Sequence, residues 1–380
     1  MKTIEQAEIA GKNIFLRVDF NVPMNSVNST QKTENSIADD NRIDAALPTI
    51  NYLLENGASK ITIGSHLGKP AQIASQNEAG RPTRKNNSEF SLWPVANRLA
   101  EKLNIDKKFD GPAERFELNE RVMLLENLRF NSGEEKDDEE YAKELAAGQD
   151  IYINDAFAVS HRANASVHAI TKFLPGYAGL LIQKEISELT KVMTEPKLPF
   201  ILIIGGVKIE DKAGVIEFLA PKVDKILLGG GVANTFLKAS GLNIGDSVYD
   251  ETMVERCKEI LKKYGEKIVL PTDFVRNNGK ILDIGAETQK KYVDIISGVK
   301  TVFWNGNLGY TEDNEYANGS RVVAEALSNI NAETVIAGGD TVGFVKSQGL
   351  DKNITFISTG GGAALEFLAG KELPGIEVLQ

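Results

Sequence analysis

Residues 199–211 read PFILIIGGVKIED, and this stretch shows the pattern that recurs along the chain. Five consecutive apolar residues, Phe200 to Ile204, do not alternate with polar residues, which is typical of a strand buried on both faces of a parallel sheet. Two glycines follow at once, and glycine suits a tight turn between a strand and a helix. The stretch therefore predicts a strand–turn–helix unit of an α/β protein.

Short apolar runs of the same kind alternate with helical patterns through the whole sequence. The predicted strands cover residues 14–18, 60–64, 122–125 and 150–153 in the first half, and 200–204, 225–228, 267–270, 301–304, 334–337 and 354–357 in the second half. Nearly all of them are rich in Val and Ile. This organisation predicts an α/β fold with two doubly wound (Rossmann-like) parallel-sheet lobes, which a hinge helix joins.

The helix between the lobes shows helical spacing of apolar residues over 182–193 and must end before Pro196. The expected divisions are an N-terminal lobe over 1–177, an interdomain helix over 178–195, a C-terminal lobe over 196–366 and a C-terminal segment over 367–380 that returns to the first lobe. Two polar stretches, 25–41 and 71–91, are predicted to be surface loop insertions.

The composition is that of a globular protein, with 380 residues of which 42% are hydrophobic and 25% are charged. A formal net charge of −10 argues against nucleic acid or an anionic membrane as a partner, because clustered Lys and Arg bind those surfaces. The single cysteine, Cys257, excludes an internal disulfide and fits a reducing compartment. The N-terminus lacks a secretory signal, and no apolar stretch approaches the ~18 residues that span a bilayer. We therefore expect a soluble, cytoplasmic protein.

Polar and cationic residues follow four predicted strands of the first half, at the edge where an open parallel sheet binds its ligands. These strand ends read Asp19-Phe20-Asn21, Ser65 to Lys69, Glu126 to Arg129 and Asn154-Asp155, the last followed by His161-Arg162. Arginine suits carboxylate or phosphate binding because its planar guanidinium donates two parallel hydrogen bonds. Four such ends in succession predict a pocket for a small, multiply charged anion rather than solvated surface charges.

The predicted strands of the second half end in glycine instead. The glycine-rich ends lie at residues 205–208, 229–231, 305–306, 338–341 and 358–362. Glycine at such a turn lets backbone N–H groups approach a phosphate, and the helix dipole adds to the attraction. Asp340 is a candidate Mg²⁺ ligand or, alternatively, a helix N-cap, and Lys208 could neutralise a transferring phosphoryl group.

Several nucleotide-binding and catalytic motifs are missing from the sequence. There is no G-x-x-x-x-G-K-[ST] loop, and no G-x-G-x-x-G follows the first predicted strand, which disfavours a dinucleotide oxidoreductase. Protein-kinase motifs, G-x-S-x-G and clustered Cys/His metal ligands are also absent. An anion pocket in one lobe and a nucleotide-phosphate pocket in the other then predict a phosphotransferase with two substrates.

Ordered motifs along almost the whole chain resemble the phosphoglycerate kinase family. They are RVDFNVP at 17–23, NRI at 41–43, SHLG at 65–68, LLENLRF at 124–130, NDAFAVSHRA at 154–163, KE at 184–185, GGGVANTF at 229–236, WNG at 304–306, GGDT at 338–341 and STGGGA at 358–363. The resemblance implies reversible transfer of the acyl phosphate of 1,3-bisphosphoglycerate to MgADP, which gives 3-phosphoglycerate and MgATP. It also implies in-line transfer on hinge closure, and a monomer.

The same resemblance implies a role for particular residues. The first lobe would bind phosphoglycerate through Asp19, Asn21, Arg42, His66, Lys69, Arg129 and Arg162. The second lobe would bind the nucleotide, ATP or ADP, through Gly206, Lys208, Lys212, Gly230, Leu282, Asn305, Glu312, Gly339, Asp340 and Thr341, with Asp340 as the Mg²⁺ ligand. Catalysis around the transferring phosphoryl group would fall to Arg42, Lys208, Gly338 and Gly361.

The sequence departs from the family pattern mainly where the adenine base would bind. Asn307 and Tyr310 stand where Pro and Val are usual, and the segment 276–282 is shorter than in the family. These changes lead to the hypothesis of relaxed adenine selectivity. Lys69 replaces a usual Arg and so loses the bidentate fork. A nucleotide-binding pseudoenzyme or a regulatory scaffold on the same fold is the alternative, although Arg42 and the other charged groups are present.

Overall fold

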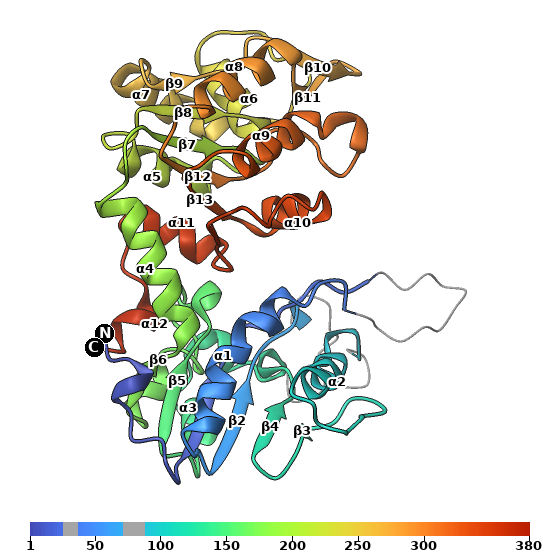
Figure 1. Cartoon of the computed structure of the whole chain (residues 1–380), viewed down its shortest axis with the longest axis vertical. Coiled ribbons are helices and arrows are strands. Elements are labelled where there is room, and N and C mark those ends of the chain that lie inside the picture. The colour runs from blue at the N-terminus through green and yellow to red at the C-terminus, as the bar shows by residue number, and fades with distance from the viewer. Residues whose placement is uncertain (26–36, 71–87) are drawn as a thin grey trace. The chain divides into compact units, whose positions relative to one another are not determined.

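The computed structural model describes residues 1–25, 37–70 and 88–380. It divides into two compact units, of which the first comprises Met1–Lys184 with Glu372–Gln380 and the second comprises Glu185–Lys371 (Figure 1). Most of the predicted loop insertions, 25–41 and 71–91, lies outside the described residues. Their described ends are partly regular, because Asn41 starts a helix and Ser88–Phe90 form a 3₁₀ turn.

The first unit is built on a six-stranded sheet. Its strands are β1 (Asn13–Arg17), β2 (Lys60–Gly64), β3 (Arg115–Glu117), β4 (Val122–Leu125), β5 (Ile151–Asn154) and β6 (Gly176–Ala178). They lie in the order β3-β4-β2-β1-β5-β6, and only β3 runs antiparallel to its neighbour. The prediction of a parallel sheet is confirmed for this lobe. The antiparallel edge strand β3 and the short strand β6 were not predicted.

The second unit contains a six-stranded sheet in which all neighbours are parallel. Its strands are β7 (Phe200–Ile204), β8 (Lys225–Leu228), β9 (Ile268–Val269), β12 (Thr301–Asn305), β13 (Glu333–Ala337) and β14 (Phe356–Ile357). The order β14-β13-β12-β7-β8-β9 reverses direction between β7 and β12. In doubly wound sheets such a reversal opens a crevice at the carboxyl ends of the two strands, where nucleotides bind.

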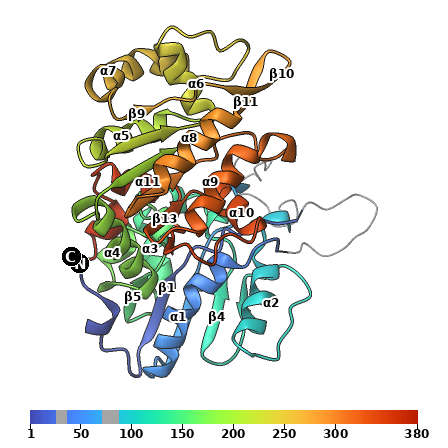
Figure 2. The same ribbon diagram turned by 45° about the horizontal axis from the view of Figure 1, so that its top comes forward.

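Helices cover both sheets (Figures 1 and 2). In the first unit they are α1 (Asn41–Glu55), α2 (Trp93–Lys102), α3 (Glu139–Ala146) and α12 (Pro374–Glu377). In the second unit they are α5 (Glu210–Leu219), α6 (Gly230–Ala239), α7 (Val254–Tyr264), α8 (Ala286–Ile296), α9 (Asn318–Ser328), α10 (Gly339–Ser347) and α11 (Gly362–Leu368). Each unit has its own apolar core, one formed by β1, β2 and β4 with α1 and α2, the other by β7 and β12 with α8 and α9.

Helix α4 (Leu180–Thr194) carries the chain from the first unit into the second. Its first turn is held by side chains of the first unit, because Leu180 N donates to Thr49 Oγ1 at 3.0 Å and Leu181 N donates to Asp155 Oδ1 at 2.9 Å. The chain returns to the first unit at its C-terminus, where Asn154 Nδ2 donates to Gly375 O at 2.9 Å. Two crossings of the chain therefore join the units.

A short hairpin stands apart from the large sheets. It consists of β10 (Phe274–Asn277) and β11 (Lys280–Ile284), which the sequence analysis did not predict. Its two-residue loop, Asn278-Gly279, has positive φ at both positions, 48° and 77°. Asn-Gly is the preferred pair for such a type I′ turn, so the turn signal was present in the sequence.

Within the described residues, no helix combines the length and the apolar character that a membrane span needs.

Candidate active site

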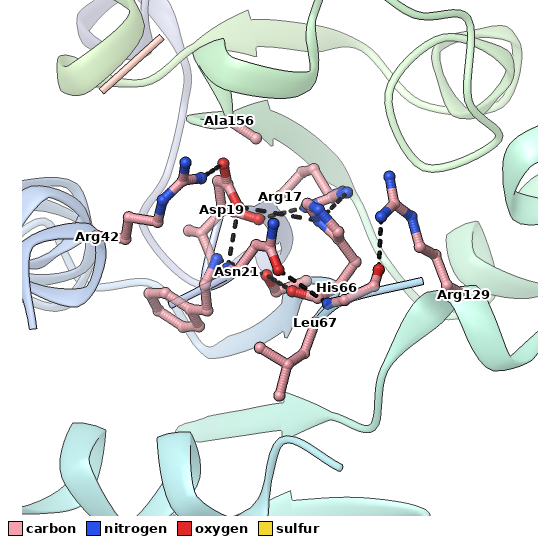
Figure 3. A network of polar contacts seen from close by, with 12 residues as sticks. Arg17, Asp19, Asn21, Arg42, His66, Leu67, Arg129 and Ala156 are labelled. Carbon is pink, nitrogen blue, oxygen red and sulfur yellow. Dashed lines mark hydrogen bonds and ion pairs between the residues drawn. The ribbon is translucent and has the colours of Figure 1, made fainter. Parts of the chain in front are cut away.

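The ends of β1 and β2 bring polar side chains of the first unit together (Figure 3). Phe20 N donates to Ser65 Oγ at 2.7 Å, which ties the two strand ends to each other. Asp19 Oδ1 accepts from Asn21 N at 3.0 Å, and Asn21 Oδ1 accepts from Gly68 N at 2.8 Å. These contacts join the two strand ends and hold Asp19 and Asn21 at the carboxyl edge of the sheet.

Arg42 reaches this edge from the first turn of α1. Its Nη1 forms an ion pair with Asp19 Oδ2, and the Arg42 side chain is 27% exposed. Burial lowers the pKa of Arg42, yet an arginine stays charged because its ordinary pKa lies so far above neutrality. The residue is thus a cation that Asp19 holds in place and that remains partly exposed to solvent.

His66 lies in the middle of the cluster and is only 2% exposed. Its pKa is held well below the ordinary value, first by burial and then by the positive charges of Arg17, Arg129, Arg42 and Arg162. Four guanidinium groups therefore act on one neutral imidazole. Such a concentration of positive charge favours binding of an anion with several negative charges.

Arg129 enters from the 3₁₀ turn Leu128–Phe130, which Asn127 caps by accepting from Arg129 N at 3.1 Å. Arg129 Nη1 donates to Gly68 O at 2.7 Å, and its Nε lies 3.3 Å from Glu135 Oε1. Arg162 and Lys69 are exposed, and Arg162 Nε donates to His161 Nε2 at 3.1 Å. The structure thus gathers Asp19, Asn21, Arg42, His66 and Arg129, whereas Lys69 and Arg162 are solvent-facing.

A buried layer beneath this cluster was missed by the sequence analysis. Arg17 Nε donates to Ser166 Oγ at 2.7 Å, and Ser166 Oγ donates to Glu134 Oε1 at 2.6 Å. Arg17 and Glu134 are 1% and 0% exposed. One signal could have pointed to it, because Arg17 is a charged residue that directly continues the apolar run Ile14–Leu16.

In the second unit the ends of β7 and β12 pack backbone against backbone. Gly205 N donates to Asn305 O at 2.9 Å, and Gly206 N donates to Asn307 O at 2.7 Å. A Cβ atom on Gly205 would lie 2.2 Å from Asn307 O, so a larger residue does not fit there. Close packing of two loops at the reversal point is thus the physical reason for this glycine.

The turns after β13 and β14 are more open. A Cβ on Gly339 or on Gly361 would meet no atom within 4 Å, while Gly338 and Gly361 have positive φ values of 98° and 51°. Thr341 Oγ1 accepts from Gly306 N at 2.8 Å and so links the start of α10 to the β12 loop. Backbone N–H groups at the start of α10 are available to an anion at this point.

Charged groups surround these turns within the second unit. Lys212 is buried and its pKa is lowered by burial, against the opposing effects of Asp211 and Asp340. Its Nζ donates to Lys208 O at 3.2 Å, while the Lys208 side chain and Asp340 are exposed. Among the described residues, no group of three or more His, Cys, Asp or Glu side chains is arranged to hold a metal ion.

The candidate base-binding residues lie around the hairpin and the β12 loop. Tyr310 N donates to Leu282 O at 2.8 Å, and the Tyr310 side chain is 51% exposed. Asn307 Nδ2 donates to Thr311 Oγ1 at 2.6 Å, while its Oδ1 is buried and has no hydrogen-bond partner among the described residues. Glu312 is exposed. Asn305 is buried, and its Nδ2 donates to Ala337 O at 2.9 Å, so that its amide group links β12 to β13.

The first doubly wound unit has converging arginines at its strand ends, and the second has glycine-rich turns in a strand order that is typical of nucleotide binding. Together these features define an α/β phosphotransferase. The chain belongs to the phosphoglycerate kinase family, since the family model described as phosphoglycerate kinase matches residues 4–371. It thus catalyses phosphoryl transfer between 1,3-bisphosphoglycerate and ADP in glycolysis.

Individual relatives agree with this assignment. The chain is 42% identical over 409 residues to a phosphoglycerate kinase of Herpetosiphon aurantiacus, covering 100% of this chain and 98% of the relative. It is similar to the structure of phosphoglycerate kinase from Coxiella burnetii, with a TM-score of 0.79, 33% identity and coverage of 99% and 98%. The crystal structure of phosphoglycerate kinase from Pyrococcus horikoshii OT3 gives a TM-score of 0.81, 32% identity and coverage of 100% and 98%.

Proposed function

We propose that the first unit binds 3-phosphoglycerate or 1,3-bisphosphoglycerate, and that the second unit binds MgATP or MgADP. The observation that carries this division is the cluster at the strand ends of the first unit, where Arg42 pairs with Asp19, Arg17 Nη2 lies 3.4 Å from His66 Nδ1 and Arg129 Nη1 donates to Gly68 O at 2.7 Å. Asp19, Asn21 and His66 would orient the small acid, with Arg129, Arg162 and Lys69 adding positive charge. Arg42 is the cation that we assign to the transferring phosphoryl group.

The reaction needs positioning and charge neutralisation more than proton transfer. The acceptor oxygen of 3-phosphoglycerate belongs to a carboxylate, which is already ionised at neutral pH, so no general base is required. Lys208 and Arg42 would offset the negative charge on the transferring group, and Gly338 and Gly361 would let the backbone approach it. Closure of the two units around both substrates would exclude water from the acyl phosphate.

On the nucleotide side, Lys212, Gly339 and Thr341 would contact the phosphates, while Gly206, Gly230, Leu282, Asn305 and Glu312 would surround the nucleoside. Asp340 would hold Mg²⁺. The exposed carboxylate of Asp340 fits that ion, because Mg²⁺ is commonly bound by one or two carboxylates together with substrate phosphates and water. The bound ion would supply charge neutralisation to the nucleotide phosphates.

A coupled assay tests the proposal directly. Phosphoryl transfer from MgATP to 3-phosphoglycerate is followed by reductive trapping of the acyl phosphate, with the purified full-length protein. Turnover that is lost on Arg42→Ala, with 3-phosphoglycerate binding measured in parallel by calorimetry, would support the assignment. A folded protein without turnover would favour the alternative of a nucleotide-binding pseudoenzyme or regulatory scaffold.

A further inference from the structure

Arg17 contacts the candidate active site from the buried interior of the first unit. It lies at the end of β1, and its Nη2 is 3.4 Å from His66 Nδ1 (Figure 3). Its other nitrogen atoms are occupied, because Nε donates to Ser166 Oγ at 2.7 Å and Nη1 donates to Val18 O. The guanidinium is thus fixed on several sides and presents one edge to the imidazole of His66.

Glu134 provides the counter-charge that keeps Arg17 buried. Its Oε1 lies 3.6 Å from Arg17 Nη2 and accepts from Ser166 Oγ at 2.6 Å, while its Oε2 accepts from Ser166 N at 3.1 Å. A buried arginine needs such a partner, because an unpaired charge in the interior is costly. Both oxygens of Glu134 are therefore engaged, and the position of the guanidinium is determined by the fold.

The contact with Arg17 decides which nitrogen of His66 carries hydrogen. A guanidinium has donors only, so the imidazole nitrogen that faces it must accept and cannot carry a proton. The competing partner, Asp19 Oδ1, is 3.9 Å from Nδ1, which is too far for a hydrogen bond, and it already accepts from Asn21 N at 3.0 Å. The hydrogen of a neutral His66 then resides on Nε2.

We propose that Arg17 is a positioning residue that holds His66 as the neutral Nε2–H tautomer, so that His66 offers a hydrogen-bond donor to an oxygen of the anionic substrate. Among the described residues, none hydrogen-bonds His66 Nε2, which leaves this donor available. The statement about the substrate rests on the proposed function. The statement about the tautomer rests on the contacts of Arg17 alone.

Nitrogen-15 NMR of the histidine rings tests the tautomer in the free, full-length protein. The chain has three histidines, and the variants His161→Gln and His168→Gln identify the His66 signals by elimination. We expect a protonated Nε2 and an unprotonated Nδ1 between about pH 6 and pH 8. A proton on Nδ1, or an imidazolium in that range, would overturn the proposal.

A double variant tests the role of Arg17 itself. Arg17→Met with Glu134→Gln removes both buried charges together, which a protein tolerates better than the loss of one partner. His66 Nδ1 then loses its donor, and we expect the Nδ1–H tautomer to become populated toward Asp19. Since a substrate contact of His66 acts alike in the ground and transition states, KM for 3-phosphoglycerate should rise roughly tenfold with kcat little changed.

Arg121→Met is the matched control, because Arg121 is a partly buried arginine of the same unit that donates to Ala58 O and Leu54 O, next to the opposite end of β4. It should leave the His66 signals and KM unchanged. An unchanged tautomer in the double variant would show that Arg17 does not set it. If 3-phosphoglycerate shifts no His66 signal in the unmodified protein, the proposed substrate site fails, while the tautomer in the free protein still decides the role of Arg17.

Discussion

Arg42 and Lys208 represent two ways of presenting a cation to a substrate. Arg42 is mostly buried and paired with Asp19, whereas Lys208 is exposed just beyond Gly205-Gly206. The first is held in place before any ligand binds, and the second keeps conformational freedom that binding would restrict. Arg42 lies in the first turn of α1 and Lys208 follows β7, and neither belongs to an apolar core, so neither contributes much to the packing of its unit.

We therefore predict that Lys208→Ala or Arg42→Ala lowers kcat by roughly a thousandfold, because each removes charge stabilisation of the transferring phosphoryl group. The thermal unfolding midpoint should change little. Steady-state kinetics with saturating substrates measures the effect, and Lys262→Ala, an exposed lysine on α7, serves as the control. A loss of tenfold or less in both variants would contradict the assigned roles.

Asp155 is a fully buried carboxyl group at the end of β5. Burial raises its pKa to about 7, although the Thr49 hydroxyl and then the N–H groups at the start of α4 lower it in part. Its Oδ1 accepts from Leu181 N, while its Oδ2 has no hydrogen-bond partner among the described residues. An unfolded aspartate has a pKa of about 3.9, so between about pH 4 and pH 7 the native state binds the extra proton.

From this shift we predict that Asp155 makes the protein less stable as the pH rises from about 4 to about 7, since stability falls wherever the native state holds more protons. Asp155→Asn keeps an acceptor for Leu181 N and should flatten that part of the profile. Urea unfolding at several pH values measures the difference. Asp224→Asn, an exposed carboxylate that accepts from Phe200 N, is the control, and equal slopes in the wild type and Asp155→Asn would refute the prediction.

The junction between β6 and α4 depends on a glycine. Gly179 precedes the helix, and a Cβ there would lie 2.2 Å from Asp155 Oδ1. The close approach brings Asp155 to the first turn of α4, where the exposed N–H groups of a helix need acceptors. The start of α4 is therefore fixed by Asp155, which follows β5, rather than by a local cap.

For Gly179→Ala we predict a loss of about 1–3 kcal/mol in the free energy of unfolding, because the added methyl group displaces the buried carboxylate. Chemical denaturation measures it. Gly298→Ala is a suitable control, since a Cβ at that position meets no atom within 4 Å. Equal stability of the two variants would mean that Asp155 can move at no cost.

The β10–β11 hairpin and the β12 loop carry the residues that we propose for the base side of the nucleotide site. The two-residue turn Asn278-Gly279 closes the hairpin, and Tyr310 is 51% exposed. On the hypothesis of relaxed adenine selectivity, we predict that kcat/KM for MgATP and MgGTP agrees within about tenfold. The coupled assay gives that ratio. A strong preference for ATP would show that the hairpin or Tyr310 recognises adenine.

The chain as a whole consists of two units with separate cores, joined by two crossings near residues 184–185 and 371–372. The candidate phosphoglycerate residues lie in one unit and the candidate nucleotide residues in the other, and the proposed in-line transfer needs both substrates at one place. We predict that 3-phosphoglycerate and a non-transferring Mg-nucleotide analogue together reduce the radius of gyration more than either alone. Small-angle X-ray scattering tests this, and an unchanged radius at saturation would exclude closure.

Regular, strongly patterned elements were predictable from sequence. The run 200–204 was predicted with its observed bounds as β7, while the strands predicted at 267–270 and 354–357 shrink to two residues each. The three-residue strands β3 and β6 were not predicted, because they are too short to show a periodic pattern of apolar residues. The hairpin was not predicted either, although Asn278-Gly279 is a strong turn signal. Its strands are only partly buried and lack an apolar run.

The sequence by itself determined the fold class, the family and the polar strand ends that form the candidate site, because those depend on periodicity and on motifs within a few residues. Only the tertiary structure decided which buried groups support the candidate site and the start of α4. Arg17 meets Ser166 across 149 positions, and Asp155 meets the start of α4 across 26. Burial, which governs the charge state of His66 and Asp155, likewise arises only when distant segments pack together, since removal of water is a property of the folded chain.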